Sequence, residues 1–251
     1  MKYYRMLLKK PLRDFVRMSS DVFMDGRKVK CAHVQNEAPT IVFENGFCSG
    51  VSCMKYWDEV FISLAKEYTL FAYDRVDTVI ENEVLEDTEN HLDDTVDLVK
   101  KLLQAKGLES PYILVGHSLG GLYMQYFAKK YAHEVRGIVL VDAVYPNGQL
   151  QGHVLDDNIA KIGKHILQMP KKLDIPIVVL SATQEALKST KCDKAKMVEL
   201  SVQDQKKYAD LYPDAKQIWV ECGHLIQYEK PDAIVDAIDA VMSALAQENE
   251  R

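Results

Sequence analysis

The stretch "YILVGHSLGGLYMQYFAKKY", residues 112–131, decides the fold of this chain. It opens with an apolar run, residues 112–116, that is too short for a helix and typical of a buried strand. From Leu119 to Tyr131 the apolar residues recur at helical spacing. Where these two segments meet, Gly116 lies two residues before Ser118 and Gly120 lies two residues after it. A serine in this G-x-S-x-G pattern, with a strand before it and a helix after it, indicates a nucleophile on a sharp turn.

Two other uses of these glycines do not fit the sequence. A dinucleotide-binding loop requires glycine at the third position of G-x-G-x-x-G, where this chain has Ser118. A phosphate-binding P-loop ends in Gly-Lys-Ser or Gly-Lys-Thr, which is absent from this stretch. The glycines are better explained by steric need, because only residues without side chains let the neighbouring strand and helix approach the turn.

The rest of the chain repeats the same alternation of short apolar runs and amphipathic stretches. A hairpin is expected first, with strands at 15–23 and 29–34 around a glycine turn. The strands that follow are expected at 40–46, 69–74, 112–116, 137–143, 175–182 and 216–222, and the helices at 53–68, 88–107, 119–131, 154–168, 193–212 and 231–247. Buried strands that alternate with helices predict an α/β fold with a mainly parallel sheet. Ligands bind such sheets beyond the carboxyl ends of the strands, where Ser118 is expected.

Composition narrows the class of protein. The 251 residues are 47% apolar and 27% charged, which suits a soluble chain with a large core. The net charge of −6 provides no broad basic surface, so nucleic acid is not expected as a partner. No apolar segment reaches the roughly 20 residues that a membrane-spanning helix needs.

The N-terminal segment and the cysteines favour a cytoplasmic protein. The basic N-terminal segment lacks the apolar core and the cleavage site of a secretory signal. The five cysteines are scattered and odd in number, unlike a disulfide framework or a zinc site. We therefore expect a cytoplasmic enzyme with reduced thiols. A homodimer is compatible with this sequence, and Cys222 lies two residues before His224.

Several motifs together resemble the α/β-hydrolase superfamily, and more narrowly a group of small, esterase-like serine hydrolases. They are "PTIVFENGFCSG", "FAYDR", "PYILVGHSLGGLYMQYFAKKY", "IVLVDAVYP" and "GHLIQYEKPDAIVDAI". The resemblance covers nearly the whole chain. It implies one α/β-hydrolase domain, residues 1–251, with an eight-stranded sheet whose second strand is antiparallel and with helices on both faces. It also implies a catalytic triad in the order serine, acid, histidine.

The resemblance places the catalytic base at His224. A serine hydroxyl is a weak nucleophile at neutral pH and needs a base within hydrogen-bond reach. His224 follows the last expected strand, in a Gly-His loop before the final helix, which is the family position of the base. His117 is adjacent to the nucleophile, but its side chain is expected to point elsewhere from the turn.

Two carboxylates compete for the third position. The commoner family position follows the seventh strand, where Glu185 lies, and the alternative position follows the sixth strand, where Asp142 lies. Asp142 has the short side chain and the rigid strand-end location that suit an orienting group. We favour Asp142 and keep Glu185 as the alternative acid.

The remaining parts of the expected site are backbone groups and a short lid. An oxyanion hole is usually built from two backbone N–H groups, here expected from Leu119 and, in the loop after the third strand, Phe47. Residues 143–174, between the sixth and seventh strands, are expected to form a short lid segment. A lid this short suggests an open pocket for small to medium acyl esters.

These expectations combine into a serine hydrolase that cleaves carboxylic esters through an acyl-enzyme, with no cofactor and no metal. Lyase, cofactor-free peroxidase or acyltransferase chemistry on the same triad is the first alternative, because a fold does not fix the reaction. A non-enzymatic small-molecule receptor is the second.

Overall fold

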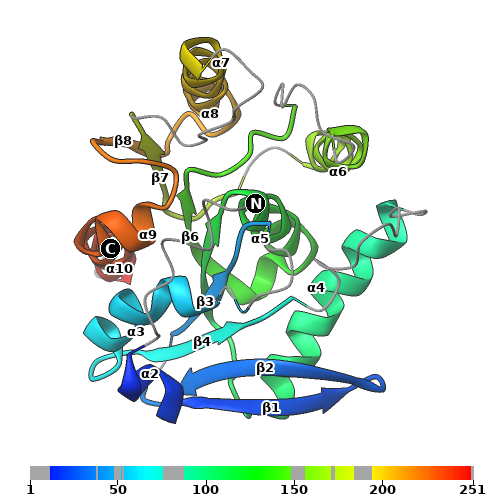
Figure 1. Cartoon of the computed structure of the whole chain (residues 1–251), viewed down its shortest axis with the longest axis vertical. Coiled ribbons are helices and arrows are strands. Elements are labelled where there is room, and N and C mark those ends of the chain that lie inside the picture. The colour runs from blue at the N-terminus through cyan, green and yellow to red at the C-terminus, as the bar shows by residue number, and fades with distance from the viewer. Residues whose placement is uncertain are drawn as a thin grey trace.

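The computed structural model describes residues 12–37, 39–47, 52, 54–75, 88–147, 156–170, 173–183 and 194–249. Its strands form one eight-stranded sheet in the order β1-β2-β4-β3-β5-β6-β7-β8 (Figure 1). The strands are β1 Ser19–Met24, β2 Arg27–Val34, β3 Thr40–Glu44, β4 Thr69–Tyr73, β5 Tyr112–His117, β6 Val135–Val141, β7 Ile177–Ala182 and β8 Lys216–Val220.

The direction of the strands matches the expected fold. β2 is antiparallel to both of its neighbours, β1 and β4, whereas all the other neighbouring strands are parallel. The mainly parallel sheet with an antiparallel second strand is therefore confirmed. Parallel strands place their carboxyl ends at the same edge of the sheet, so the turns after β3, β5, β6 and β8 meet there.

Helices cover both faces of this sheet (Figure 1). Neighbouring side chains of β5 belong to two different core clusters. Leu114 belongs to the cluster that includes Leu122 of the next helix, and Val115 belongs to the cluster that includes Phe61 of α3. Every residue of β5 is buried, as expected for a parallel strand between two helical layers. The described helices, including two 3₁₀ turns, are α2 Arg13–Arg17, η1 Met54–Trp57, α3 Asp58–Leu64, α4 Thr88–Ala105, α5 Leu119–Lys130, η2 Ala132–Glu134, α6 Asp156–Gln168, α7 Lys194–Lys206, α8 Tyr208–Leu211, α9 Ile226–Glu229 and α10 Pro231–Asn249.

Two expected elements differ from the structure. The first strand was expected from residue 15, but the ladder starts where Ser19 pairs with Ala32, and the residues before it form the short helix α2. This helix buries Phe15, whose ring packs edge-on against Phe61 at 5.3 Å. The single helix expected at 193–212 is interrupted at Lys207, which separates α7 from α8.

Candidate active site

Ser118 lies in the turn between β5 and α5. Its φ of 53° and ψ of −122° fall outside the conformations that residues with side chains ordinarily adopt. A Cβ atom at Gly116 would lie 2.8 Å from the carbonyl oxygen of Gly120, and one at Gly120 would lie 2.4 Å from the carbonyl oxygen of Asn45. Both glycines are therefore required by close packing around the turn, which explains the pattern on either side of the serine.

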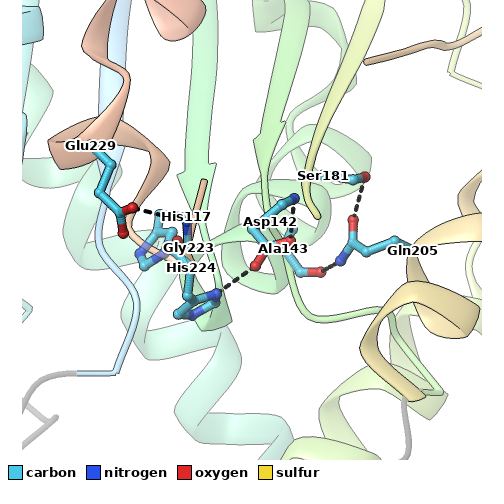
Figure 2. Close-up of polar contacts among 9 residues, drawn as sticks. His117, Asp142, Ala143, Ser181, Gln205, Gly223, His224 and Glu229 are labelled. Atoms are coloured by element: carbon cyan, nitrogen blue, oxygen red, sulfur yellow. Dashed lines mark hydrogen bonds and ion pairs between the residues drawn. The ribbon is translucent and has the colours of Figure 1, made fainter. Parts of the chain in front are cut away.

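His224 and Asp142 are in direct contact although they lie on different turns (Figure 2). The Nδ1 atom of His224, in the segment between β8 and α9, lies 2.6 Å from Oδ2 of Asp142. Asp142 follows β6, is 4% exposed, and accepts a second hydrogen bond at Oδ1 from the backbone N–H of Ala182, at 3.0 Å. A carboxylate held in this way can accept the Nδ1–H of the imidazole and leave Nε2 as the basic nitrogen.

The turns that carry Ser118 and Asp142 are joined by their backbones. The N–H of Ser118 donates to the carbonyl oxygen of Val141 at 3.0 Å, and the carbonyl oxygen of Ser118 accepts from the N–H of Val144 at 3.0 Å. These bonds follow from the adjacency of β5 and β6 in the sheet. Ser118 and Asp142 are thus fixed to one edge of the sheet, whereas His224 lies on the separate segment between β8 and α9.

Within the described part of the chain, no direct hydrogen bond joins Ser118 Oγ to His224 Nε2. Contacts of this kind are commonly long without substrate and shorten in the complex.

The loop after β3 lies against Ser118. A Cβ atom at Gly46 would come within 2.9 Å of both the Cβ of Ser118 and the Nδ1 of His117. The two expected oxyanion donors lie nearby in the chain: Phe47 is the next residue of this loop, and Leu119 is the first residue of α5. Phe47 is 51% exposed.

Glu185, the alternative acid, lies outside the described residues. The observed geometry therefore concerns Asp142 alone.

His117 has a structural role that the sequence did not indicate. Its Nε2 lies 2.9 Å from the carbonyl oxygen of His224, and the two rings are 4.6 Å apart. Burial, and secondarily the nearby His224, lower the pKa of His117 well below its ordinary value. The neutral ring can donate its Nε2–H to the His224 carbonyl and so anchor the loop that carries the expected base. In the sequence, only its position next to Ser118 could have suggested this role.

Two further side chains hold the backbone beside the candidate triad (Figure 2). The Nε2 of Gln205, near the end of α7, donates to the carbonyl oxygen of Ala143 at 2.7 Å. Glu229 of α9 accepts from the N–H of Gly223 at 3.0 Å, directly before His224. The expected helix at 193–212 gave no sign of the first contact, because Gln205 resembles any other polar helix residue in the sequence.

The described residues contain no cluster of histidine, cysteine or acidic side chains that could hold a metal ion, and none of their helices is long and apolar enough to cross a bilayer. Cys222, two residues before His224, is 3% exposed, and burial raises its pKa to about 11. Its thiol is therefore poorly suited to ionise near neutral pH.

Comparison with known proteins establishes the family. Residues 39–164 match the family model described as alpha/beta hydrolase fold, so the chain belongs to that family. Two relatives come from Bacillus subtilis strain 168. The uncharacterized protein YqjL is 24% identical over 229 residues, which cover 83% of this chain and 85% of YqjL. The uncharacterized protein YbdG is 29% identical over 126 residues, which cover 50% of this chain but only 38% of YbdG.

Solved structures with the same fold include enzymes of different specificity. A mutant of the meta-cleavage product hydrolase CumD from Pseudomonas fluorescens IP01 has a TM-score of 0.66 and 15% identity, over 92% of this chain and 99% of CumD. The esterase RhEst1 from Rhodococcus sp. ECU1013 has a TM-score of 0.61 and 19% identity, over 91% of this chain and 99% of RhEst1. At these identities the likeness shows a shared fold.

Proposed function

We propose that this protein is a serine hydrolase that cleaves carboxylic esters of small to medium size. The observation that carries the proposal is the 2.6 Å contact between His224 Nδ1 and Asp142 Oδ2, next to a strained turn that presents Ser118. A strained backbone, a buried carboxylate and an imidazole at one edge of a sheet are the parts that nucleophilic catalysis requires. The esterase name of RhEst1 is consistent with this choice of substrate.

The reaction would proceed in two stages. Ser118 Oγ forms a bond to the ester carbonyl carbon while its proton passes to His224 Nε2, which leaves a negatively charged tetrahedral intermediate. The N–H groups of Leu119 and Phe47 would stabilise that charge. When the C–O bond breaks, His224 returns the proton to the leaving alcohol. Water then attacks the acyl-enzyme by the same route, which releases the acid and restores the serine hydroxyl.

The proposed lid, residues 143–174, supports a substrate of modest size. Its described helix, α6, packs its buried residues Ile162 and Ile166 in the core cluster that also includes α4 and α5. At Gly163 a Cβ atom would lie 1.5 Å from the carbonyl oxygen of Pro146, so the helix sits directly on the segment after β6. A lid whose described helix packs this closely against the rest of the domain would leave the entrance open to varied esters.

The nucleophile is tested by labelling and turnover. The wild-type protein is expected to react with a fluorophosphonate probe and to hydrolyse p-nitrophenyl acetate, whereas Ser118→Ala should abolish labelling and lower kcat by about 10⁴-fold or more. Ser52→Ala is a matched control that removes a hydroxyl from another loop. Labelling that persists in the Ser118→Ala protein would show that another serine reacts.

The acid is tested by a pair of isosteric variants. Asp142→Asn should lower kcat by about 10⁴-fold, because an amide in place of the carboxylate favours the wrong imidazole tautomer. Glu185→Gln should leave kcat within about threefold of wild type, since Asp142 would still orient His224. The larger loss in Glu185→Gln would instead assign the acid to the position after the seventh strand.

A further inference from the structure

Arg75 follows β4 and is buried beside the loop that carries the proposed oxyanion donor. Its Nη1 forms a hydrogen-bonded ion pair with Glu44 Oε1 and also donates to the carbonyl oxygen of Asn45 at 3.0 Å. Its Nη2 donates to the carbonyl oxygen of Gly46 at 3.1 Å. One guanidinium group therefore contacts three consecutive residues, from the end of β3 into the loop.

The guanidinium group is itself held in place. Its central carbon lies 4.6 Å from the centre of the Tyr123 ring of α5, a cation–π contact. The partner carboxylate of Glu44 is fully buried, and burial raises its pKa to about 7 although Arg75 acts in the opposite direction. Burying two charges is costly, and an apolar pair of similar volume often gives equal stability. The contacts of this pair with the loop therefore point to a role in geometry.

We propose that Arg75 is a positioning residue for the oxyanion hole, because its hold on the Gly46 carbonyl turns the N–H of Phe47 toward Ser118. In a trans peptide the C=O of one residue and the N–H of the next point in opposite directions. The sheet order places β4, with Arg75, and β5, with Ser118, on opposite sides of β3. Gly46 lies between them, against the Cβ of Ser118. This inference rests on the proposed hydrolase function and deepens it.

The chemistry of the guanidinium group suits this task. Its planar fork donates in fixed directions to several acceptors at once, whereas a lysine ammonium is a compact charge on a flexible stem. Lysine at position 75 could still pair with Glu44, but it could not hold both loop carbonyls in the same geometry.

The test compares Arg75→Lys with wild type and with Arg136→Lys, a matched substitution in an exposed ion pair with Glu248. Arg75→Lys is expected to lower kcat for p-nitrophenyl acetate by about 10²-fold with KM within about threefold, because an oxyanion donor acts mainly in the transition state. Affinity for a phenylboronic acid, which forms a tetrahedral adduct with serine, should fall by a similar factor. Arg136→Lys should match wild type in both measurements.

A folded Arg75→Lys protein with wild-type kcat and boronate affinity would overturn the inference. If this variant does not fold, hydrogen exchange at the Phe47 amide of the wild-type protein decides the question. Exchange should slow at least about tenfold when the boronate adduct forms, since the N–H then has an acceptor, and unchanged exchange would overturn the inference. Turnover and labelling of the wild-type protein are measured first, and their absence would contradict the proposed function itself. Turnover that does not change in Arg75→Lys would contradict only the positioning role of Arg75.

Discussion

Two residues of the candidate site adopt backbone conformations with positive φ. Ser118 has a φ of 53° and Asp142 has a φ of 39°. Such conformations cost about 1–3 kcal/mol each and persist where the surrounding structure determines them. Here the backbone bonds of Ser118 to Val141 and Val144 provide that support. The strain is therefore concentrated in the two turns that present the proposed nucleophile and the proposed acid.

His117 gives a prediction about stability and pH. The folded protein keeps this buried ring neutral, whereas an unfolded chain protonates histidine near pH 6.5. Below about pH 6.5 the unfolded state therefore binds one more proton at this residue, and the free energy of unfolding should fall by about 1.4 kcal/mol for each pH unit of acidification. Above that pH His117 should contribute no pH dependence.

Urea unfolding of wild type and His117→Gln between about pH 5 and pH 7.5 measures this effect. In the variant, the free energy of unfolding should change less steeply with pH, by up to the equivalent of one bound proton. The glutamine amide can still donate to the His224 carbonyl, so kcat should stay within about threefold of wild type. His133→Gln, at an exposed histidine, is the control. Equal slopes in wild type and His117→Gln would contradict a neutral buried ring.

At the scale of elements, the interruption between α7 and α8 brings two buried side chains to the turn after Asp142. Gln205 donates to the carbonyl oxygen of Ala143 at 2.7 Å, and the hydroxyl of Tyr208 donates to that of Val144 at 2.9 Å. The side-chain oxygen of Gln205 also accepts from Ser181 of β7 at 2.8 Å. These contacts hold the backbone of the two residues that follow the proposed acid.

Gln205→Glu tests whether α7 positions the acid. The new side chain has the same shape but cannot donate from that atom when ionised, so the Ala143 carbonyl loses its partner, at a cost of about 1–3 kcal/mol in stability. A misplaced acid turn should also lower kcat by about tenfold or more with little change in KM. Gln203→Glu is the control, an exposed change of the same kind on the same helix. It replaces an exposed hydrogen bond to Glu199 by two like charges, at a cost of about 0.2–0.5 kcal/mol, and should leave kcat unchanged.

An unchanged kcat in a destabilised Gln205→Glu protein would limit this contact to a structural role. Gln205→Met fills the space but forms no hydrogen bond and adds no charge. Comparison with Gln205→Glu therefore separates the effect of the lost hydrogen bonds from the effect of a buried charge. Both variants should lose kcat if the contact with Ala143 is what matters.

Over the whole molecule, local patterns predicted the fold better than the site. The strand runs and the glycines around Ser118 can be recognised locally, because each depends on neighbouring residues. His224 was expected as the base from the family resemblance. His117, Arg75 and Gln205 act on residues that lie 107, 29 to 31 and 62 positions away in the chain. The order of the strands in the sheet determines which backbone carbonyl each buried polar side chain contacts. The spacing of apolar residues along the chain does not indicate that order.

The expectation of one domain over residues 1–251 gives the last prediction. The two large core clusters lie on opposite faces of one sheet and share its strands, as β5 shows by sending Leu114 to one cluster and Val115 to the other. Both helical layers pack on the same strands, so the loss of one layer destabilises the strands on which the other layer packs. Both layers should therefore unfold in one urea transition. Far-UV circular dichroism and the fluorescence of Trp57, isolated by Trp219→Phe, should therefore have the same midpoint. Trp57 is fully buried in the cluster that includes α3 and α10, so a fluorescence midpoint at lower urea would show that this layer unfolds first.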